Sequence, residues 1–367
     1  MVKTPATKRE LGKTINYQLL HMKYILLPFS WLYGLITDVR NYFYDKGLFQ
    51  SKSFRIPIIN VGNITVGGTG KSPQVEYLIR LLKNNYKIVT LSRGYGRKTK
   101  EFILADDTVN ANTIGDEPMQ FYQKFRNQIN VAVGEKRMEA IEQILKQKPD
   151  TEIIILDDAF QHRAVQPSLN ILLIDYNRPI EEDYPFPAGR LRERIHGAKR
   201  ADVVVITKCP TNLNLQQQES FKNRMKPYLK ENTPVLFTEI LYGKPINCRS
   251  GLMDFEVSQN ILLVSGIAKP ELFETYCRKN FKVVNHLIFK DHHQYNETDF
   301  RSIHVQKQQA VTDFCVLMTE KDMVKFKPFL NHKLLKDILL FYLPIEVGFL
   351  NEKSIFDNLI FSSLKIS

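Results

Sequence analysis

The chain has 367 residues, of which 43% are hydrophobic and 25% charged, a balance typical of a globular protein with room for two domains. Its formal net charge of +12 favours an anionic partner, namely a nucleic acid, a membrane surface or a phosphorylated substrate, and does not choose among them. Four widely spaced cysteines form no Cys-x-x-Cys pair, which argues against a disulfide framework or a zinc site and indicates a cytosolic protein.

The N-terminal segment, residues 1–50, combines positive charge with apolar and aromatic residues. Residues 1–23 carry five basic side chains and one acidic one, and an apolar run of 13 residues follows at 24–36. That run is well short of the ~20 residues that span a bilayer, and no small-residue cleavage site of a signal peptide follows it. The basic flank and the aromatic residues Trp31 and Tyr42 predict a helix that lies in the membrane interface. A helix docked on the protein's own core and a helix that spans the membrane are the alternatives.

Residues 61–73, VGNITVGGTGKSP, follow an apolar run and precede a helical pattern at 74–83. This is the arrangement of a phosphate-binding P-loop, in which glycines let backbone N–H groups point at an anion. Lys71 adds a charge for the outer phosphates, and Ser72 offers a hydroxyl to Mg²⁺. Thr65 stands where the common motif has glycine, so the loop is a variant. A glycine-rich turn without a ligand is the alternative. The predicted nucleotide-binding residues are Gly67, Gly68, Thr69, Gly70, Lys71 and Ser72.

Short runs rich in Ile and Val alternate with helical patterns after the P-loop. The runs lie at 87–92, 130–133, 152–157, 170–175 and 202–207, with helical patterns at 119–125 and 135–146. Runs this continuous suit the strands of a parallel sheet that is buried on both faces. The sequence therefore predicts an α/β fold with a doubly wound, mostly parallel sheet in a P-loop domain over residues 51–240.

A polar stretch at 211–233 precedes a new strand at 234–241, which suggests a domain boundary. Apolar runs follow at 261–267, 282–289 and 314–319, with helical patterns at 269–279 and 297–308. These elements predict a second, smaller α/β domain over residues 241–367.

Two acidic residues, Asp157 and Asp158, end the apolar run 152–157. An acid at the carboxyl end of a buried strand is the Walker B arrangement, which holds Mg²⁺ beside a P-loop. The alternative is that the two acids cap a turn. Gln161 and His162 continue the phrase LDDAFQHR toward the same crevice.

Candidates for proton transfer lie in two polar loops. Asp116 and Glu117 in GDEP either complement a helix dipole or place a carboxylate where it accepts a proton from a hydroxyl group. His292 and His293 in DHHQY either are structural or share that proton.

Arginine-rich loops offer sites for an anionic group. Arg93 and Arg97 lie in SRGYGR, and Arg190 and Arg192 lie in PAGRLRER beside the acid Glu193. Solvated basic turns are the alternative. The phrase TKCP at 207–210 lacks the acid of the guanine-reading Asn-Lys-x-Asp motif, which favours ATP over GTP.

These phrases together resemble the tetraacyldisaccharide 4'-kinase (lipid A 4'-kinase) family. The matching stretches run in order from about residue 60 to TEKD at 319–322, so the resemblance covers most of the chain. It implies Mg²⁺–ATP-dependent phosphorylation of the 4'-hydroxyl of a tetraacylated glucosamine disaccharide 1-phosphate in lipid A biosynthesis. The enzyme would then work at the cytoplasmic face of the bacterial inner membrane, as a peripheral or interfacial protein. The positive charge would draw it to that anionic surface.

The resemblance also implies roles for particular residues. Asp116 would take the hydroxyl proton and His292 would orient it, with His293 as the neighbouring alternative, and Lys71 would hold the β- and γ-phosphates. Ser72 with Asp157 or Asp158 would hold Mg²⁺, and closure between the two domains would assemble the site. The substrate-binding residues would be Arg93, Arg97, Gln161, His162, Arg190, Arg192 and Glu193. Ala159 departs from the glycine that the family motif often has.

Two other classes of protein fit parts of the sequence. One is a P-loop NTPase that acts as a switch or metallochaperone without a lipid acceptor, for which only the pair at 292–293 suggests a metal site. The other is a nucleic-acid-dependent ATPase, but no RNA-binding phrase or helix-turn-helix pattern occurs, so no nucleic-acid partner is predicted. Nothing in the sequence indicates an oligomeric state.

Overall fold

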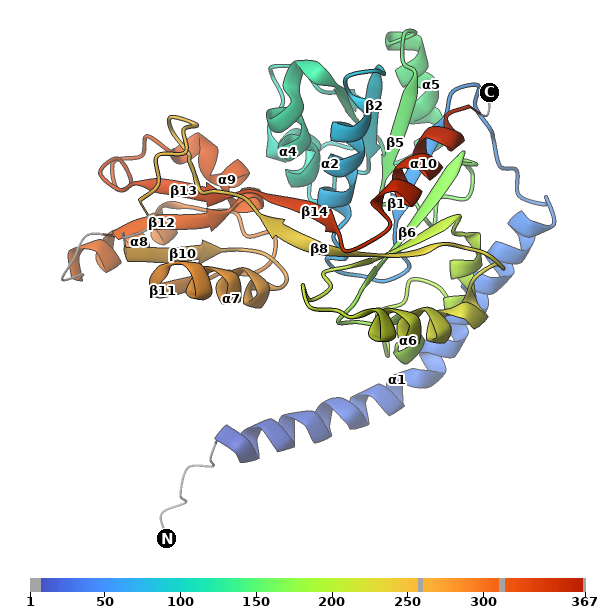
Figure 1. The fold of residues 1–367 in the computed structure, drawn as a ribbon, viewed down its shortest axis with the longest axis horizontal. Helices are drawn as coiled ribbons and strands as arrows, with labels where there is room; N and C mark the ends of the chain where they lie inside the picture. The colour runs from blue at the N-terminus through green and yellow to red at the C-terminus, as the bar shows by residue number, and fades with distance from the viewer. Residues whose placement is uncertain (1–7, 257–259, 310–313, 366–367) are drawn as a thin grey trace.

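Two β-sheets, of nine and five strands, organise the chain (Figure 1). The structure, a computed structural model, describes residues 8–256, 260–309 and 314–365, with only the backbone described for 8–23. The strands of the first sheet are β1 (Ile58–Gly62), β2 (Ile88–Ser92), β3 (Ile103–Leu104), β4 (Asn130–Val133), β5 (Ile153–Asp157), β6 (Leu169–Asp175), β7 (Val203–Thr207), β8 (Val235–Tyr242) and β14 (Ile345–Phe349). Their order across the sheet is β14-β8-β7-β6-β1-β5-β2-β4-β3.

The first sheet is parallel except at its two edges, where β3 and β14 run antiparallel to their neighbours. Its five central strands, β7, β6, β1, β5 and β2, are buried along their whole length, as the Ile- and Val-rich runs predict. Strand β1, which feeds the glycine loop, pairs with β5 on one side and β6 on the other. The doubly wound α/β prediction is therefore confirmed.

Helices cover both faces of the first sheet. The helices here are α2 (Lys71–Leu82), α3 (Ala111–Ile114), α4 (Asp116–Phe125), α5 (Arg137–Gln147), α6 (Leu215–Met225) and α10 (Lys353–Ser363). Helices α2, α4 and α10 bury Ile79, Phe121 and Phe356 in one core. Helices α5 and α6 pack on the opposite face, where they bury residues such as Ile141 and Phe221.

The second sheet has the order β11-β10-β12-β13-β9, with only the edge strand β9 antiparallel. Its elements are β9 (Ile246–Asn247), β10 (Asn260–Ser265), α7 (Pro270–Asn280), β11 (Lys282–Ile288), α8 (Glu297–Gln309), β12 (Phe314–Thr319), α9 (Glu320–Phe326) and β13 (Leu340–Leu343). Side chains of β10 alternate between two cores: Leu262 and Val264 face one, and Ile261 and Leu263 face the other. We call residues 246–343 the second domain and the rest, apart from the N-terminal helix, the P-loop domain.

The division of the chain differs from the predicted one at 240–241. Strand β8 runs through that point, and β14 and α10 return from the second domain to the first sheet. The antiparallel pair β8–β14, with Tyr242 opposite Ile345, therefore connects the two domains (Figure 1). The polar stretch before β8 includes an ordinary surface helix, α6, and marks no boundary.

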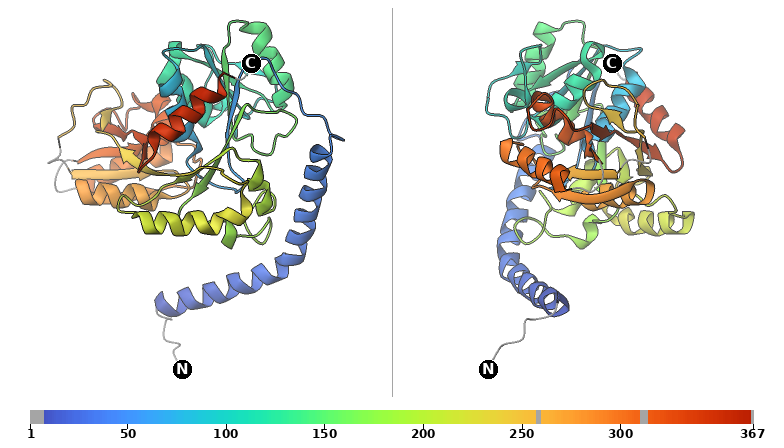
Figure 2. Two further views of the ribbon diagram at one scale, coloured as in Figure 1. Left: turned by 45° about the vertical axis from the view of Figure 1, so that its right-hand side comes forward. Right: turned by 90° about the vertical axis from the view of Figure 1, so that its left-hand side faces the viewer.

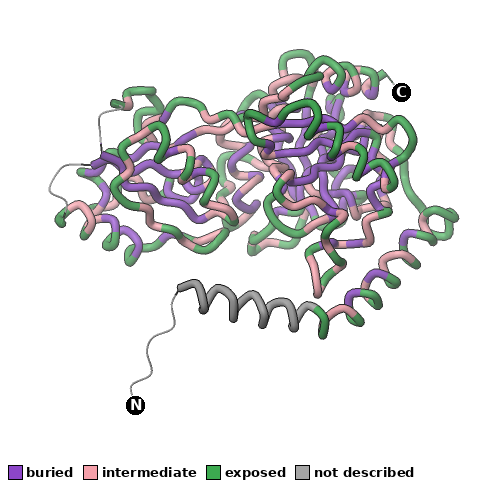
Figure 3. Tube along the Cα trace, turned by 60° about the horizontal axis from the view of Figure 1, so that its bottom comes forward, coloured by how far each residue is buried: buried purple, intermediate pink, exposed green. Residues whose placement is uncertain are grey.

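The N-terminal helix α1 (Lys8–Asp45) projects from the P-loop domain and is bent, with Pro28 inside it (Figure 2). No helix in the part of the chain that the structure describes is long and apolar enough to cross a membrane. One face of α1 packs on the P-loop domain (Figure 3), where Ser30 and Asn41 are buried. The other face exposes large apolar side chains, namely Tyr24, Ile25, Phe29, Trp31, Leu32, Leu35, Ile36 and Val39. The side chains of the basic residues in 1–23 lie outside the described residues.

We expect Phe356→Ala in α10 to lower the free energy of unfolding of the P-loop domain by about 3–5 kcal/mol, because this ring is 0% exposed in the core. The matched control is Ile355→Ala on the same helix, which removes a side chain that is 42% exposed and should change this free energy by less than about 1 kcal/mol. Urea denaturation followed by circular dichroism measures both. Equal effects of the two variants would contradict the packing of α10 on the first sheet.

Candidate functional site

A cavity of about 470 Å³ lies between the two domains. The P-loop domain lines it with 66–73 and with parts of β8 and β14, and the second domain lines it with the segments after β10, β11 and β12. In parallel sheets the loops at the carboxyl ends of the strands form such crevices. Both sheets therefore point their loops at one shared space.

Two residues of the glycine loop have backbone conformations that favour glycine. Gly67 and Gly70 have φ angles of +104° and +84°, which residues with a Cβ rarely adopt. Thr69 is held from two sides, since Asn63 Nδ2 donates to its Oγ1 at 2.6 Å and Thr207 Oγ1 donates to its carbonyl at 2.8 Å. Helix α2 starts directly after the loop, so the helix N-terminus also faces the cavity.

Two carboxylates lie beside the loop at the end of β5. Asp158 Oδ1 lies 3.7 Å from Lys71 Nζ and 2.8 Å from Arg192 Nη1. Burial acts to raise the pKa of Asp158, but these two cations lower it below its usual value. Asp157 is 1% exposed, and its Oδ1 has no hydrogen-bond partner among the described residues. Burial and the nearby Glu117 raise the pKa of Asp157 to about 8.

The donor set beside the loop suits a hard cation that also binds phosphates. No group of three or more His, Cys, Asp or Glu side chains within the described ranges is placed to hold a metal ion. Mg²⁺ does not need such a cage, because it is commonly held by one or two carboxylates together with substrate phosphates. Asp157, with its unpartnered oxygen, and Ser72 in the loop supply oxygen ligands of this kind.

Asp116 and His292 meet across the domain boundary. Asp116 begins α4 and is 5% exposed, and its Oδ2 lies 3.1 Å from His292 Nδ1 and 3.4 Å from Lys325 Nζ. Burial acts to raise the pKa of Asp116, but His292 and Lys325 lower it below its usual value, so the group is a carboxylate at neutral pH. His293 is instead held by Asp299 at 2.8 Å. Of the two histidines, the geometry therefore places His292 at Asp116.

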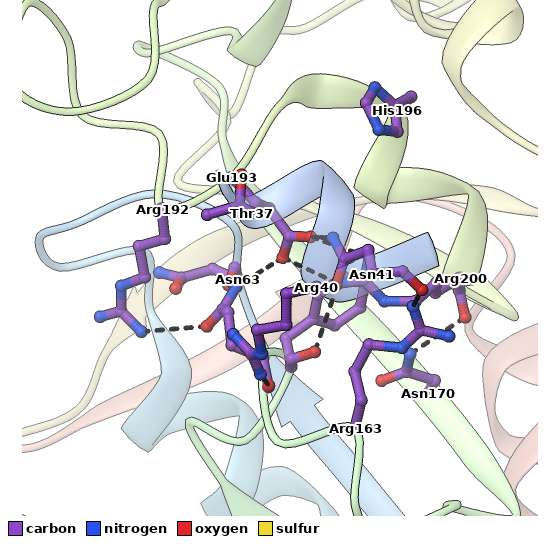
Figure 4. Close-up of polar contacts among 12 residues, drawn as sticks. Thr37, Arg40, Asn41, Asn63, Arg163, Asn170, Arg192, Glu193, His196 and Arg200 are labelled. Carbon is purple, nitrogen blue, oxygen red and sulfur yellow. Dashed lines mark hydrogen bonds and ion pairs between the residues drawn. The ribbon is translucent and has the colours of Figure 1, made fainter. Parts of the chain in front are cut away.

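Glu193 is the centre of a buried polar cluster next to α1 (Figure 4). Both of its oxygens accept hydrogen bonds from Arg200, at 2.7 and 2.8 Å. Gln161 Nε2 donates to one oxygen at 3.0 Å, and Asn41 Nδ2 from α1 donates to the other at 3.0 Å. Burial acts to raise the pKa of Glu193, but Arg200 and the amide donors lower it. The neighbouring Arg192 reaches Asp158, so this cluster adjoins the end of the cavity that the glycine loop and Asp158 line. We call this the phosphate end of the cavity.

The other predicted substrate residues make different contacts. Arg97 braces its own loop by donating to the carbonyls of residues 100 and 101. Arg93 is mainly exposed and lies 3.7 Å from Glu135. Arg190 lines a small pocket on the other side of the glycine loop. Arg93, Arg97 and His162 do not line the cavity.

Four cavity residues were not predicted from the sequence as site residues. Tyr95 and Lys321 line the cavity beside the predicted candidate Glu117, and Lys269 and Glu239 line it elsewhere. Tyr95 and Lys321 lie in the phrases SRGYGR and TEKD, so those motifs could have indicated them. Lys269 and Glu239 lie in no such phrase, and only the domain arrangement identifies them.

Comparisons with known proteins point to one family. Residues 22–365 match the family described as tetraacyldisaccharide-1-P 4'-kinase. The tetraacyldisaccharide 4'-kinase of Flavobacterium johnsoniae is 43% identical over 349 residues, 94% of this chain and 98% of that protein. The protein of the same name from Flavobacterium psychrophilum is 44% identical over 344 residues, 93% of this chain and 97% of that protein. A crystal structure of LpxK from Aquifex aeolicus in complex with ATP is similar with a TM-score of 0.74 and 28% identity, covering 94% of this chain and 99% of that one.

We expect the half-buried ring of His162 to give the protein a pH dependence of stability. Burial, Arg137 and Arg40 lower the pKa of His162 to about 4, below the ~6.5 of an unfolded chain. Between these values the unfolded state binds the extra proton, so stability falls as the pH falls. We expect the wild-type protein to lose roughly 1–2 kcal/mol relative to His162→Gln from pH 7 to pH 5, measured by thermal unfolding of both at each pH. A constant difference between the two proteins would contradict a lowered pKa of His162 in the folded protein.

Proposed function

The chain belongs to the tetraacyldisaccharide-1-P 4'-kinase family, and we propose that its site transfers the γ-phosphate of ATP to the 4'-hydroxyl of a tetraacylated disaccharide 1-phosphate. One observation carries this proposal. The glycine loop and His292 line the same cavity, and Asp116 contacts His292 at 3.1 Å, so the proposed proton acceptor lies next to the space that would hold the phosphoryl donor.

The nucleotide binds with its phosphates on the glycine loop. Lys71 and the backbone N–H groups of the loop hold the β- and γ-phosphates. The adenine ring lies toward the β8–β14 pair, which supplies apolar side chains such as Ile240 and Val347. Lys208 supports this arrangement because its ammonium group contacts the carbonyl of Gly68 and lies 3.0 Å from buried Asp175.

Mg²⁺ fits the oxygen donors beside the phosphates. Ser72 and Asp157 would hold the ion, with Asp158 next to them and already paired with Lys71. When bound, the ion neutralises charge on the phosphate oxygens during transfer.

Asp116 serves as the base. As a carboxylate it takes the proton of the acceptor hydroxyl while that oxygen forms a bond to the γ-phosphorus, and the bond between the γ-phosphorus and the β–γ bridging oxygen breaks, so ADP leaves. Lys325 and His292 occupy Oδ2 of Asp116, which leaves Oδ1 for the acceptor. The transfer then needs little beyond positioning and charge neutralisation.

The acceptor enters beside α1. The cluster around Glu193 lies between this helix and the phosphate end of the cavity, and Arg192 links the two. A lipid held in a bilayer by its acyl chains would present its sugar head group there while the exposed apolar face of α1 lies in the membrane surface. We propose that this surface is the cytoplasmic face of the bacterial inner membrane.

The reaction itself can be measured directly. With [γ-³²P]ATP, Mg²⁺ and a tetraacylated disaccharide 1-phosphate in detergent micelles, we expect label at the 4' position. Asp116→Asn should lower kcat by about 10²–10⁴-fold because the base is lost. The matched control is Asp107→Asn, whose side chain is 75% exposed and pairs with Arg126 on the surface. ATP hydrolysis without labelled lipid would contradict the proposed acceptor.

Membrane binding is tested on the exposed face of α1. The double variant Trp31→Glu and Leu35→Glu should weaken binding to anionic phospholipid vesicles more than tenfold, since burial of each such side chain is worth about 1.5–3 kcal/mol. Ile355→Glu on α10 changes an exposed apolar residue in the same way and should bind as the wild type does. Vesicle co-sedimentation measures all three, and equal binding would place the lipid contact elsewhere.

A further inference from the structure

The phrase TEKD at 319–322 joins β12 to α9, and three of its four residues have evident structural contacts. The Thr319 hydroxyl caps α9. Asp322 is 0% exposed and accepts hydrogen bonds from the N–H of Gly266 and the hydroxyl of Tyr295. Glu320 pairs with Lys124 of α4 at 2.6 Å, across the domain boundary. These contacts fix the start of α9 and leave Lys321 to be explained.

Lys321 points into the phosphate end of the cavity. Its Nζ lies 3.4 Å from His292 Nε2 and 3.6 Å from Glu117 Oε1, and its side chain is 20% exposed. Burial acts to lower the pKa of Lys321, but the carboxylates around it, first of all Glu117, raise it, so the group is an ammonium ion. An ion pair with Glu117 alone would not require Lys321 to contact His292.

The contacts of His292 form a chain from Lys321 to Asp116. An ammonium group has only donors, so His292 Nε2 must accept from Lys321. The other ring nitrogen then carries the proton and donates to Asp116 Oδ2, which as a carboxylate can only accept. Asp291 Oδ2, 4.0 Å from Nε2, and Lys325, which contacts Asp116, are the other charged groups around this chain. The ring of Tyr95 lies 5.2 Å from that of His292.

Resting on the proposed function, we propose that Lys321 is a positioning residue that fixes the Nδ1–H tautomer of His292 and so holds the catalytic carboxylate of Asp116 in place. Without it the imidazole is free to carry its proton on Nε2, which leaves two acceptors, Nδ1 and Oδ2, facing each other at 3.1 Å. That arrangement repels, and Asp116 loses the donor that orients it. The second domain thereby supplies both the histidine and the group that sets its proton.

Kinetics of Lys321→Met tests this role. Met keeps the length and the apolar stem of the side chain and removes the donor. We expect kcat for phosphate transfer to fall about 10- to 100-fold, with KM for ATP changed less than threefold, because the change acts on the base and not on nucleotide binding. In a His292→Ala background the same substitution should lower kcat less than threefold, since Lys321 acts through the ring. Losses that multiply in the double variant, or a change confined to KM, would overturn the proposal.

A spectroscopic readout tests the tautomer without turnover. In ¹⁵N-histidine-labelled protein, the His292 signals are assigned by their absence in His292→Ala. We expect Nδ1–H in the wild type and a shift toward Nε2–H in Lys321→Met. An Nε2–H ring in the wild type, or an unchanged ring in the variant, would overturn the proposal even if the variant is inactive.

The matched control is Lys327→Met, which removes the same charge from an exposed position just after α9 and should match the wild type in kcat and in the imidazole spectrum. Lys321→Arg, which keeps the charge and a donor, should recover part of the lost kcat. Should the wild type fail to label the lipid, the proposed function fails. Should the wild type label it and Lys321→Met match its kcat, only the role of Lys321 fails.

Discussion

The 3.1 Å contact between Asp116 and His292 joins two domains, and the chemistry of the site depends on it. Neither domain holds both groups, so the relative position of the two sheets sets the geometry of the base. Further ion pairs across the same boundary support that position, among them Lys124 with Glu320 at 2.6 Å and Lys269 with Asp175 at 3.2 Å. The first joins α4 to α9, and the second joins the end of β6 to the residue before α7, so together they resist rotation of one domain on the other.

Removing these charged side chains at the domain boundary from water costs free energy, so only a few relative positions of the two domains are stable. Lys124 serves two carboxylates, Glu76 and Glu320, and the latter has a raised pKa because burial and Glu76 oppose its charge. If the two domains moved slightly apart, these charged side chains would lose their partners before water could hydrate them. Such intermediate domain positions are therefore high in free energy. The geometry of the site is thereby tied to a specific fit between the domains.

The sequence predicts the parts of the site that are local in the chain. The glycine loop, its lysine and the acids after β5 follow from the order strand, loop, helix, because that order alone aims backbone N–H groups and carboxylates at one edge of a sheet. Arginines show the limit of this reasoning. Arg97 and Arg192 both lie in basic loops with glycine nearby, but Arg97 bonds its own loop and Arg192 reaches Asp158. Only the tertiary fold separates them, as it does for the link between Asn41 and Glu193.

The β8–β14 pair has a topological consequence. The chain leaves the first sheet after Tyr242 and re-enters it at Ile345, and the N–H of Gly243 donates to the carbonyl of Pro344 at 2.9 Å. The second domain is thus an insertion at the tip of a β-hairpin, with its two ends in contact. Insertions of this kind leave the host sheet continuous, so evolution can add, exchange or reshape the inserted domain without altering the order of the strands that carry the glycine loop.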